Sequence, residues 1–255
     1  ANNTGYENTA IGHSSLYSNN SGWHNTAVGF DALRRNFTGF QNTAVGHHSL
    51  NFNTGNYNTA IGYNSGSSVS SGYNLTLIGI DANPTSPTAS NQVTLGNIFV
   101  TSLRCNVTTI TSLSDARDKK DIKELTLGLE FINRLKPRQY NWDKRDWYDG
   151  NISDGSKMQE APTAGFIAQE LDEAQNGAGA EWLNLVLKDN PEKWEATPGN
   201  LLPVMVKAIQ ELKAENDVLK AKVESLKTIE ERLEKLEEML KENSNSLNVN
   251  LAEEK

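Results

Sequence analysis

The 255-residue sequence has one cysteine, Cys105, and no histidine after His48. A single cysteine excludes an intrachain disulfide framework, and Cys105 is expected to be a small packing residue. Without histidine, the later part of the chain cannot hold a Ser-His-Asp triad, a Cys-His pair or a histidine metal site. Neither a metal nor another cofactor is predicted.

Long apolar runs and a net positive charge are also missing. Only 36% of the residues are hydrophobic, and no apolar run approaches the roughly 20 residues that span a bilayer. The formal net charge of -8 argues against nucleic acid or an anionic membrane as a partner. Residues 1–110 are rich in Asn, Ser, Thr and Gly, whereas 115–255 hold nearly all the charge, so the chain divides into parts of different construction.

Residues 1–110 consist of repeats. GYENTAIGHSSL at 5–16 recurs as GWHNTAVGFDAL at 22–33 and GFQNTAVGHHSL at 39–50, and three looser copies follow. A shared glycine recurs at intervals of 17, 17, 16, 17 and 17 residues, at Gly12, Gly29, Gly46, Gly62, Gly79 and Gly96. A fixed period below 20 is typical of stacked β-strands. Because each repeat has few apolar residues, the sequence predicts a trimeric β-solenoid or a triple β-helix.

Two sets of side chains in the repeats could suggest ligands. His47 and His48 are adjacent in an expected strand, where they would point to opposite faces, so His13, His24, His47 and His48 are predicted to be surface residues. Aromatic residues at equivalent positions predict a packing ladder between coils, and a sugar-binding surface is the alternative. They are Tyr6, Trp23, Phe40 and Tyr73.

From Leu201 the apolar pattern becomes helical. Heptad spacing predicts a coiled coil over 201–243, with Asn216 at a polar core position and 244–255 as a tail. Its a and d residues are Ile209, Leu212, Leu219, Val223, Leu226, Ile229, Leu233, Leu236 and Leu240. Because repeats and helix both need partner chains, the simplest assembly is a homotrimer, although heptads alone also allow a dimer.

The middle of the chain, 111–200, has a globular composition and predicts an α+β module. Residues 121–135 are expected to form a helix, 138–143 a strand, and 163–174 a strand followed by a helix. Its expected apolar anchors are Trp142, Trp147, Trp182 and Trp194.

The segment TSLSDARDKKDIKEL at 111–125 places Ser114 five residues before Lys119. A lysine can activate a serine when burial favours the neutral amine. The same residues also fit a helix start, with Ser112 and Asp115 as a capping box. The residues alone leave both interpretations open.

Four ordered motifs carry a resemblance: SLSDARDKKDI, LKPRQYNWD, GFIAQELDEA and LLPVMVKAIQELKAE. Together they resemble the C-terminal intramolecular chaperone family of phage tail spikes and tail fibres, also found in endosialidase tailspikes and the myelin regulatory factor. The resemblance implies a module that trimerises the chain, templates folding of the β-structure before it, and is released by self-cleavage. Such a fibre would fold in the cytoplasm of the producing cell and then be located in a virion tail or in another extracellular fibre.

The resemblance also implies roles for single residues. Ser114 would be the nucleophile and Lys119 its general base, with Asp115 and Arg117 as supporting residues. The bond between Leu113 and Ser114 would be cut, and the Ser114–Asp115 bond is a lesser candidate. Asp118 departs from the family, which usually has an apolar residue there. A carboxylate beside Lys119 favours the protonated amine and opposes its action as a base.

The expected fold class is therefore mixed: a β-repeat shaft at 1–110, an α+β module at 111–200, a trimeric coiled coil at 201–243 and a tail at 244–255. One alternative is a permanently attached trimerisation cap of a fibre or adhesin, with no proteolysis. A carbohydrate-active enzyme is a weaker alternative, because no spaced pair of acids in the repeats supports it. A cell-surface glycan or receptor remains a partner that the shaft could bind.

Overall fold

The computed structural model describes residues 4–106 and 110–253. It divides into two compact units, Ala1–Lys119 with Lys188–Trp194, and Lys120–Leu187 with Glu195–Lys255. The first unit contains the β-solenoid, and the second contains an α+β region and a long helix, so the mixed fold class is confirmed. Among the helices described, none has a stretch apolar enough and long enough for a membrane crossing.

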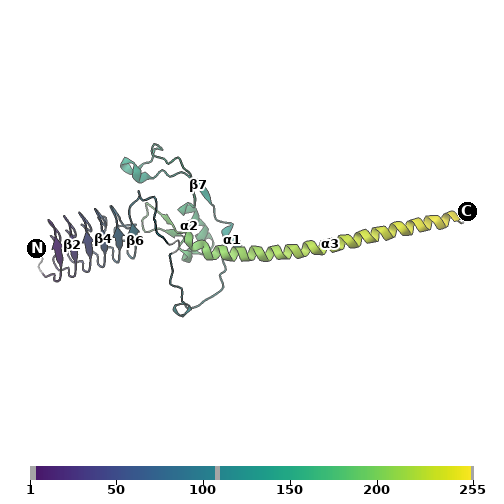
Figure 1. Ribbon diagram of the computed structural model, residues 1–255, viewed down its shortest axis with the longest axis horizontal. Helices are drawn as coiled ribbons and strands as arrows, with labels where there is room; N and C mark the ends of the chain where they lie inside the picture. Colours follow the sequence, from purple (N-terminus) through teal and green to yellow (C-terminus); the bar gives the residue numbers. More distant parts are fainter. Residues whose placement is uncertain (1–3, 107–109, 254–255) are drawn as a thin grey trace. The chain divides into compact units, whose positions relative to one another are not determined.

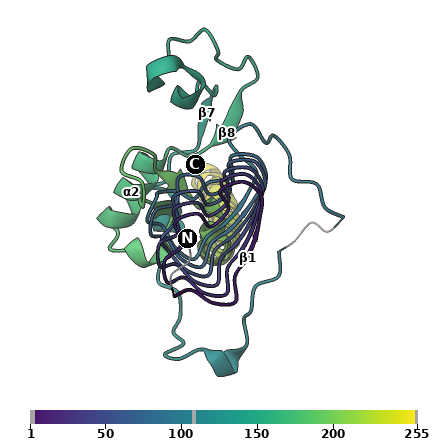
Figure 2. The ribbon, with the colours of Figure 1, turned by 90° about the vertical axis from the view of Figure 1, so that its left-hand side faces the viewer.

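Six strands of three residues form one parallel sheet in the first unit (Figure 1). Each residue pairs with its equivalent in the next repeat, as Thr26 does with Thr43. Viewed along the solenoid, the coils superimpose, with the strands on one side (Figure 2). Because neighbouring strands belong to the same chain, each repeat is one coil of a β-solenoid, and the triple β-helix alternative is wrong. The strands are β1 Thr9–Ile11, β2 Thr26–Val28, β3 Thr43–Val45, β4 Thr59–Ile61, β5 Thr76–Ile78 and β6 Val93–Leu95.

A single chain closes this core because hydrogen bonds supplement the few apolar side chains. The Asn before each of the first four strands, which the Asn-Thr motif contributes, points inward and forms a ladder. Its Oδ1 accepts a backbone N–H from the next coil at 2.9–3.0 Å, and its Nδ2 donates to a glycine carbonyl of the next coil at 2.8–2.9 Å. The members are Asn8, Asn25, Asn42 and Asn58. Buried backbone groups are thereby paired, as a stable interior requires.

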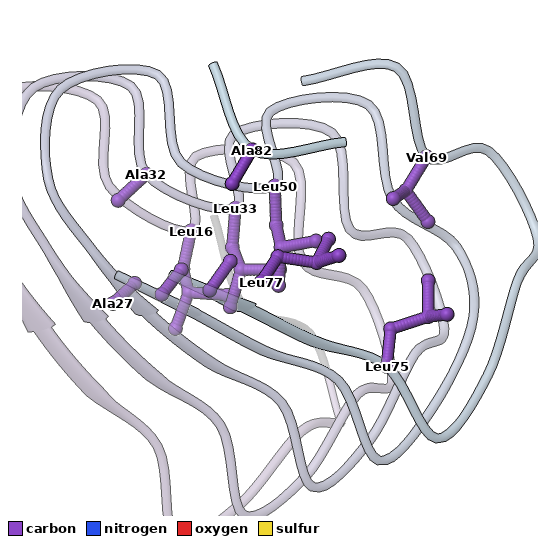
Figure 3. Close-up of a cluster of buried hydrophobic side chains, with 11 residues drawn as sticks. Leu16, Ala27, Ala32, Leu33, Leu50, Val69, Leu75, Leu77 and Ala82 are labelled. Atoms are coloured by element: carbon purple, nitrogen blue, oxygen red, sulfur yellow. The ribbon is translucent and has the colours of Figure 1, made fainter. Parts of the chain in front are cut away.

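The apolar part of the core is a row of leucines on the turn after the strands. Leu16, Leu33 and Leu50 lie in line from coil to coil (Figure 3). The next coil has Gly66 in this row, and the strand that follows it, β5, has Leu77 where the earlier strands have alanine. A Cβ at Gly66 would lie 2.6 Å from Leu50 Cδ2 and 3.0 Å from Leu77 Cδ1. Leu77 therefore fills the space that the missing side chain leaves.

The interval of 16 residues interrupts a second asparagine row. Asn36 Nδ2 donates to Asn19 Oδ1 at 3.0 Å. In the next coil Asn53 lies two residues before its glycine instead of three, and its Oδ1 accepts from Gly55 N and Asn58 Nδ2. Asn36 Oδ1 is consequently a buried acceptor without a hydrogen-bond partner. The shortened coil is thus distinguishable from its neighbours.

His47 and His48 lie in a turn after β3, not in a strand. Their ring centroids are 4.1 Å apart and His48 has φ +58°, so the expectation of opposite faces is wrong. His48 Nε2 is 3.4 Å from Asp31 Oδ2. Within 4–106 and 110–253, no cluster of His, Cys, Asp and Glu suits a metal ion.

The aromatic packing ladder is confirmed for three of its four residues. Tyr6 stacks on Trp23 at 5.9 Å between centroids, and Trp23 on Phe40 at 4.6 Å, with the rings nearly parallel. Asn56 occupies the equivalent position in the next coil and separates these rings from Tyr73. A second ladder, which the sequence did not reveal, follows the strands with centroid distances of 5.0–5.3 Å: His13, Phe30, His47 and Tyr63.

The second unit contains two short antiparallel sheets and three helices. β7 Arg138–Tyr140 pairs with β8 Thr163–Gly165, and β9 Val186–Leu187 pairs with β10 Glu195–Ala196. The strands expected within 138–143 and 163–174, and the helix after the second, are therefore confirmed. The helices are α1 Leu129–Ile132, α2 Ala168–Gly177 and α3 Leu202–Glu253, and short 3-10 turns lie at Arg145–Trp147, Asp149–Asn151, Glu181–Leu183 and Pro198–Leu201.

The helix predicted over 121–135 is mostly wrong. Only α1 is helical, because Gly128 at φ -143° and ψ -131° interrupts the pattern. The Glu211 carboxylate of α3 instead accepts a hydrogen bond from Leu129 N at 2.7 Å, and a Cβ at Gly128 would lie 2.1 Å from it. Because Gly128 has no side chain, the Glu211 carboxylate of α3 can reach the backbone at the start of α1.

Two expectations about buried residues are wrong. Trp142 is 41% exposed and Trp182 60%, and Cys105 is exposed. The core of the second unit consists of smaller residues, which include Phe131, Leu171, Leu183, Leu185, Leu201 and Val204.

Helix α3 is a single helix whose predicted coiled-coil residues lie on the surface. Their exposed fractions run from 52% for Val223 to 68% for Leu240. The helix continues through 244–253, part of the segment expected to be a tail, whose last two residues lie outside the described ones. The chain alone therefore leaves the heptad residues without the burial that they predict.

We expect Asn42→Ala to destabilise the solenoid. The change leaves Asn58 N–H unpaired in the interior, at about 1–3 kcal/mol, and removes one of the two side-chain hydrogen bonds that Gly55 C=O accepts. Thermal unfolding followed by circular dichroism should show a clearly lower midpoint. Asn20→Ala removes an exposed asparagine and is the control, so equal midpoints for the two variants would contradict the role of the ladder.

Candidate functional site

The candidate site lies in the first unit, on the segment that follows the solenoid. A 3-10 turn, η1 Ala116–Asp118, follows Asp115 directly. Asp115 Oδ1 accepts a hydrogen bond from Arg117 N at 2.8 Å and thereby caps the turn. The capping box with Ser112 is therefore wrong, because Asp115 is itself the cap residue.

The turn brings Ser114 and Lys119 together. Lys119 N donates to Ala116 O at 3.2 Å, which reverses the chain at the end of η1. As a result Lys119 Nζ lies 2.5 Å from Ser114 Oγ. At this separation a proton can pass between hydroxyl and amine, provided that the amine is neutral.

Arg117 holds the capping carboxylate from the side. Its Nε lies 3.0 and 3.2 Å from the two oxygens of Asp115, and its Nη2 lies 2.6 Å from Oδ2. Hydrogen bonds from this guanidinium and from the Arg117 backbone lower the pKa of the Asp115 carboxyl, and the same pairing raises the pKa of Arg117. The ion pair joins the cap residue of η1 to the middle of the turn and so supports the turn that carries the dyad.

The site is open to solvent in the single chain. Leu113 is fully exposed, and all residues from 110 to 119 are exposed. A lysine acts as a base near neutral pH when burial disfavours its charged form, so this geometry lacks a requirement of the chemistry. Asp118, the residue that departs from the family, is exposed at the end of η1.

The structure therefore brings together four of the predicted residues: Ser114, Lys119, Asp115 and Arg117. Spacing alone could not show that Asp115 both caps the turn and pairs with Arg117. An Asp two residues before an Arg is a weak signal, because such pairs are common on solvated surfaces.

The aromatic ladders of the solenoid do not form an open sugar platform. Neighbouring rings cover one another along the stack, with interplanar angles of 1–17° for most pairs. A sugar that stacks on an aromatic ring needs a ring face that no neighbouring ring covers.

We expect the pKa of Asp115 to depend on Arg117. In the wild type the carboxyl should titrate below the ordinary value for aspartate, about 3.9. Because the folded-state pKa is lowered, the turn is supported at neutral pH and loses that support as the pH falls through the lowered pKa. In Arg117→Gln the pKa should rise toward the ordinary value, as measured by NMR of the carboxyl carbon. Lys120→Gln removes a nearby charge without this hydrogen bond, and an equal rise in that control would contradict the pairing.

One protein family matches the region of the chain that begins at this site. Residues 114–180 match a family described as Chaperone of endosialidase, so the match begins at Ser114. It covers about a quarter of the chain and confirms the resemblance that the motifs indicate. No curated protein and no solved structure matches the chain.

Proposed function

Because residues 114–180 form a chaperone of endosialidase domain that follows a β-solenoid, we propose that the chain is the end of a tail fibre or tail spike. In this proposal the domain and α3 assemble three chains, template folding of the solenoid, and are then released by self-cleavage. The observation that carries the proposal is the 2.5 Å distance between Lys119 Nζ and Ser114 Oγ. This pair lies at the first residues of the matched domain, where a cut would separate it from the solenoid.

The cut would proceed in two steps. Neutral Lys119 takes the proton of Ser114 Oγ, which attacks the carbonyl carbon of Leu113. The bond from this carbon to Ser114 N breaks, the nitrogen receives the proton from Lys119, and an ester joins Leu113 to Ser114 Oγ. Water then hydrolyses the ester to the Leu113 carboxylate and the Ser114 hydroxyl.

Cleavage is proposed to wait for assembly. Ser114 and Lys119 are exposed in the single chain, so surfaces of partner chains would supply the burial that favours a neutral lysine. This order would protect the chain from losing its chaperone before the solenoid has formed.

Assembly would use α3. Its heptad residues are more than half exposed, and a parallel coiled coil buries such residues against the same residues of other copies. A trimer is what the family resemblance implies, while the heptads themselves also allow a dimer.

The solenoid gives the chaperone a physical task. Parallel strands pair only after closure of a whole coil, and unpaired strand edges expose folding chains to misassembly. Three chains joined at their C-terminal ends have a high local concentration, which favours correct association. Release after folding would remove the element that started assembly and make unfolding hard to reverse.

We expect wild-type chain to divide into fragments 1–113 and 114–255. Ser114→Ala lacks the nucleophile and Lys119→Ala lacks the base, so both should remain at 28.1 kDa. Denaturing gels and mass spectrometry measure this, and the released fragment should begin with Ser114.

Matched controls are Ser112→Ala and Lys120→Ala, which remove the same groups beside the dyad and should still be cut. If wild type stays at full length like the dyad variants, self-cleavage is wrong. The assembly role is then unaffected, because Ser114→Ala is expected to assemble normally.

We expect the solenoid to depend on the C-terminal region for folding. A chain that ends at residue 110 should be insoluble or unassembled, whereas full-length Ser114→Ala should be soluble and trimeric. Size-exclusion chromatography with light scattering distinguishes these results. A soluble trimer of the truncated chain would contradict the chaperone role.

Asp118 favours a second function, a permanently attached trimerisation cap. If assembly brought its carboxylate against Lys119, the negative charge would oppose removal of the proton that a base must lose. In that case wild type and the dyad variants would be equally intact and equally trimeric.

A further inference from the structure

One side of the solenoid has an outward surface that continues over all six coils, here called the strand face. It consists of the first and third residue of each strand and the residue two positions beyond. The middle residue of β2–β5 is buried, because side chains alternate across a strand. The third residues form a row in which each pairs with the next: Ile11, Val28, Val45, Ile61, Ile78 and Leu95.

The third strand residues of the strand face are all apolar, and threonines, aromatic rings and histidines lie beside them. Ile11 is 60% exposed, Ile61 42%, Ile78 41% and Leu95 50%. Beside this row run Phe30, Tyr63 and Ile80, which are 43–55% exposed. None of its positions is Asp, Glu, Lys or Arg. Large exposed apolar surfaces of this kind usually mark interaction sites.

Its side chains repeat with the spacing of the coils. The strands are in register, about 4.8 Å apart, so ridges of Ile and Val run along the solenoid over about 24 Å. The stacked His13, Phe30, His47 and Tyr63 rings follow the same spacing. A surface that fits these ridges along their length must have the same period, and another copy of the chain has it.

We propose that the strand face packs against the strand faces of other copies of this chain. The inference rests on the proposed assembly through α3, because a parallel coiled coil joins copies that run in the same direction. Aligned copies present equal ridges at equal heights, and uncharged faces meet without repulsion or the desolvation of ions. The few apolar residues of each repeat are then divided between the core of one solenoid and contacts between solenoids.

The experiment measures access to this face in the assembled full-length chain. In a Ser114→Ala, Cys105→Ser background, Ile61→Cys places a thiol on the strand face. Phe52→Cys, at a residue 49% exposed outside that face, is the matched control. A bulky maleimide reagent should label the Ile61→Cys thiol at least tenfold more slowly than the control in the native oligomer. The two should react equally in denaturant.

Light scattering on the same samples distinguishes a failure of the strand-face contact from a failure of the assembly through α3. An oligomer in which both thiols react equally fast overturns the strand-face contact and leaves the assembly in place. A monomer overturns both. Ile78→Cys, which lies one coil further along, repeats the measurement in case Ile61→Cys does not fold, and slow labelling there also supports the contact.

Discussion

The solenoid depends on the satisfaction of hydrogen bonds inside a very narrow coil. An interior lined by alanine and single leucines buries too little apolar surface to offset the cost of ordering seventeen residues per coil by itself. The inward asparagines change this balance, since Oδ1 and Nδ2 join each coil to the next like extra backbone groups. The narrow coil also explains three features of each early repeat. They are a small residue in the middle of the strand, a glycine at the corner and an asparagine before the strand. At Gly46, for example, φ is +136° and a Cβ would lie 2.3 Å from the Gly62 carbonyl oxygen.

The sequence predicted the solenoid because its period is visible without knowledge of any contact. It missed why one chain suffices, since an asparagine in a turn and one in a ladder look alike until the coils are stacked. The middle region was harder, because its order comes from residues far apart in the sequence. Leu129 is held by Glu211, 82 residues away, and the amphipathic pattern contains Gly128, after which α1 begins. The burial of the tryptophans was predicted from a general preference of large apolar residues, which Trp142 and Trp182 do not follow in the single chain.

At the candidate site, the residue types and their spacing were predictable, and the local geometry was not. A separation of five residues does not bring a lysine back to a serine in an extended chain. A tight turn does so here, and Asp115 and Arg117 stabilise that turn. In the single chain Ser114 and Lys119 lie at hydrogen-bonding distance but are exposed to solvent. The two side chains are therefore positioned for a proton transfer without the burial that would favour it. This arrangement would suit the proposed self-cleavage, which should occur once and only after the proposed assembly.

The shortened coil has a consequence for alignment. Near-identical repeats are exchangeable, so chains that associate through them could settle one coil out of step with almost the same contacts. The missing residue near Asn53 and the exchange of Leu for Gly at Gly66 make one part of the solenoid unlike the rest. A chain displaced by one coil would set this irregular part beside a regular one. If copies pack through their strand faces as proposed, this irregular part would distinguish the aligned arrangement from one displaced by a coil.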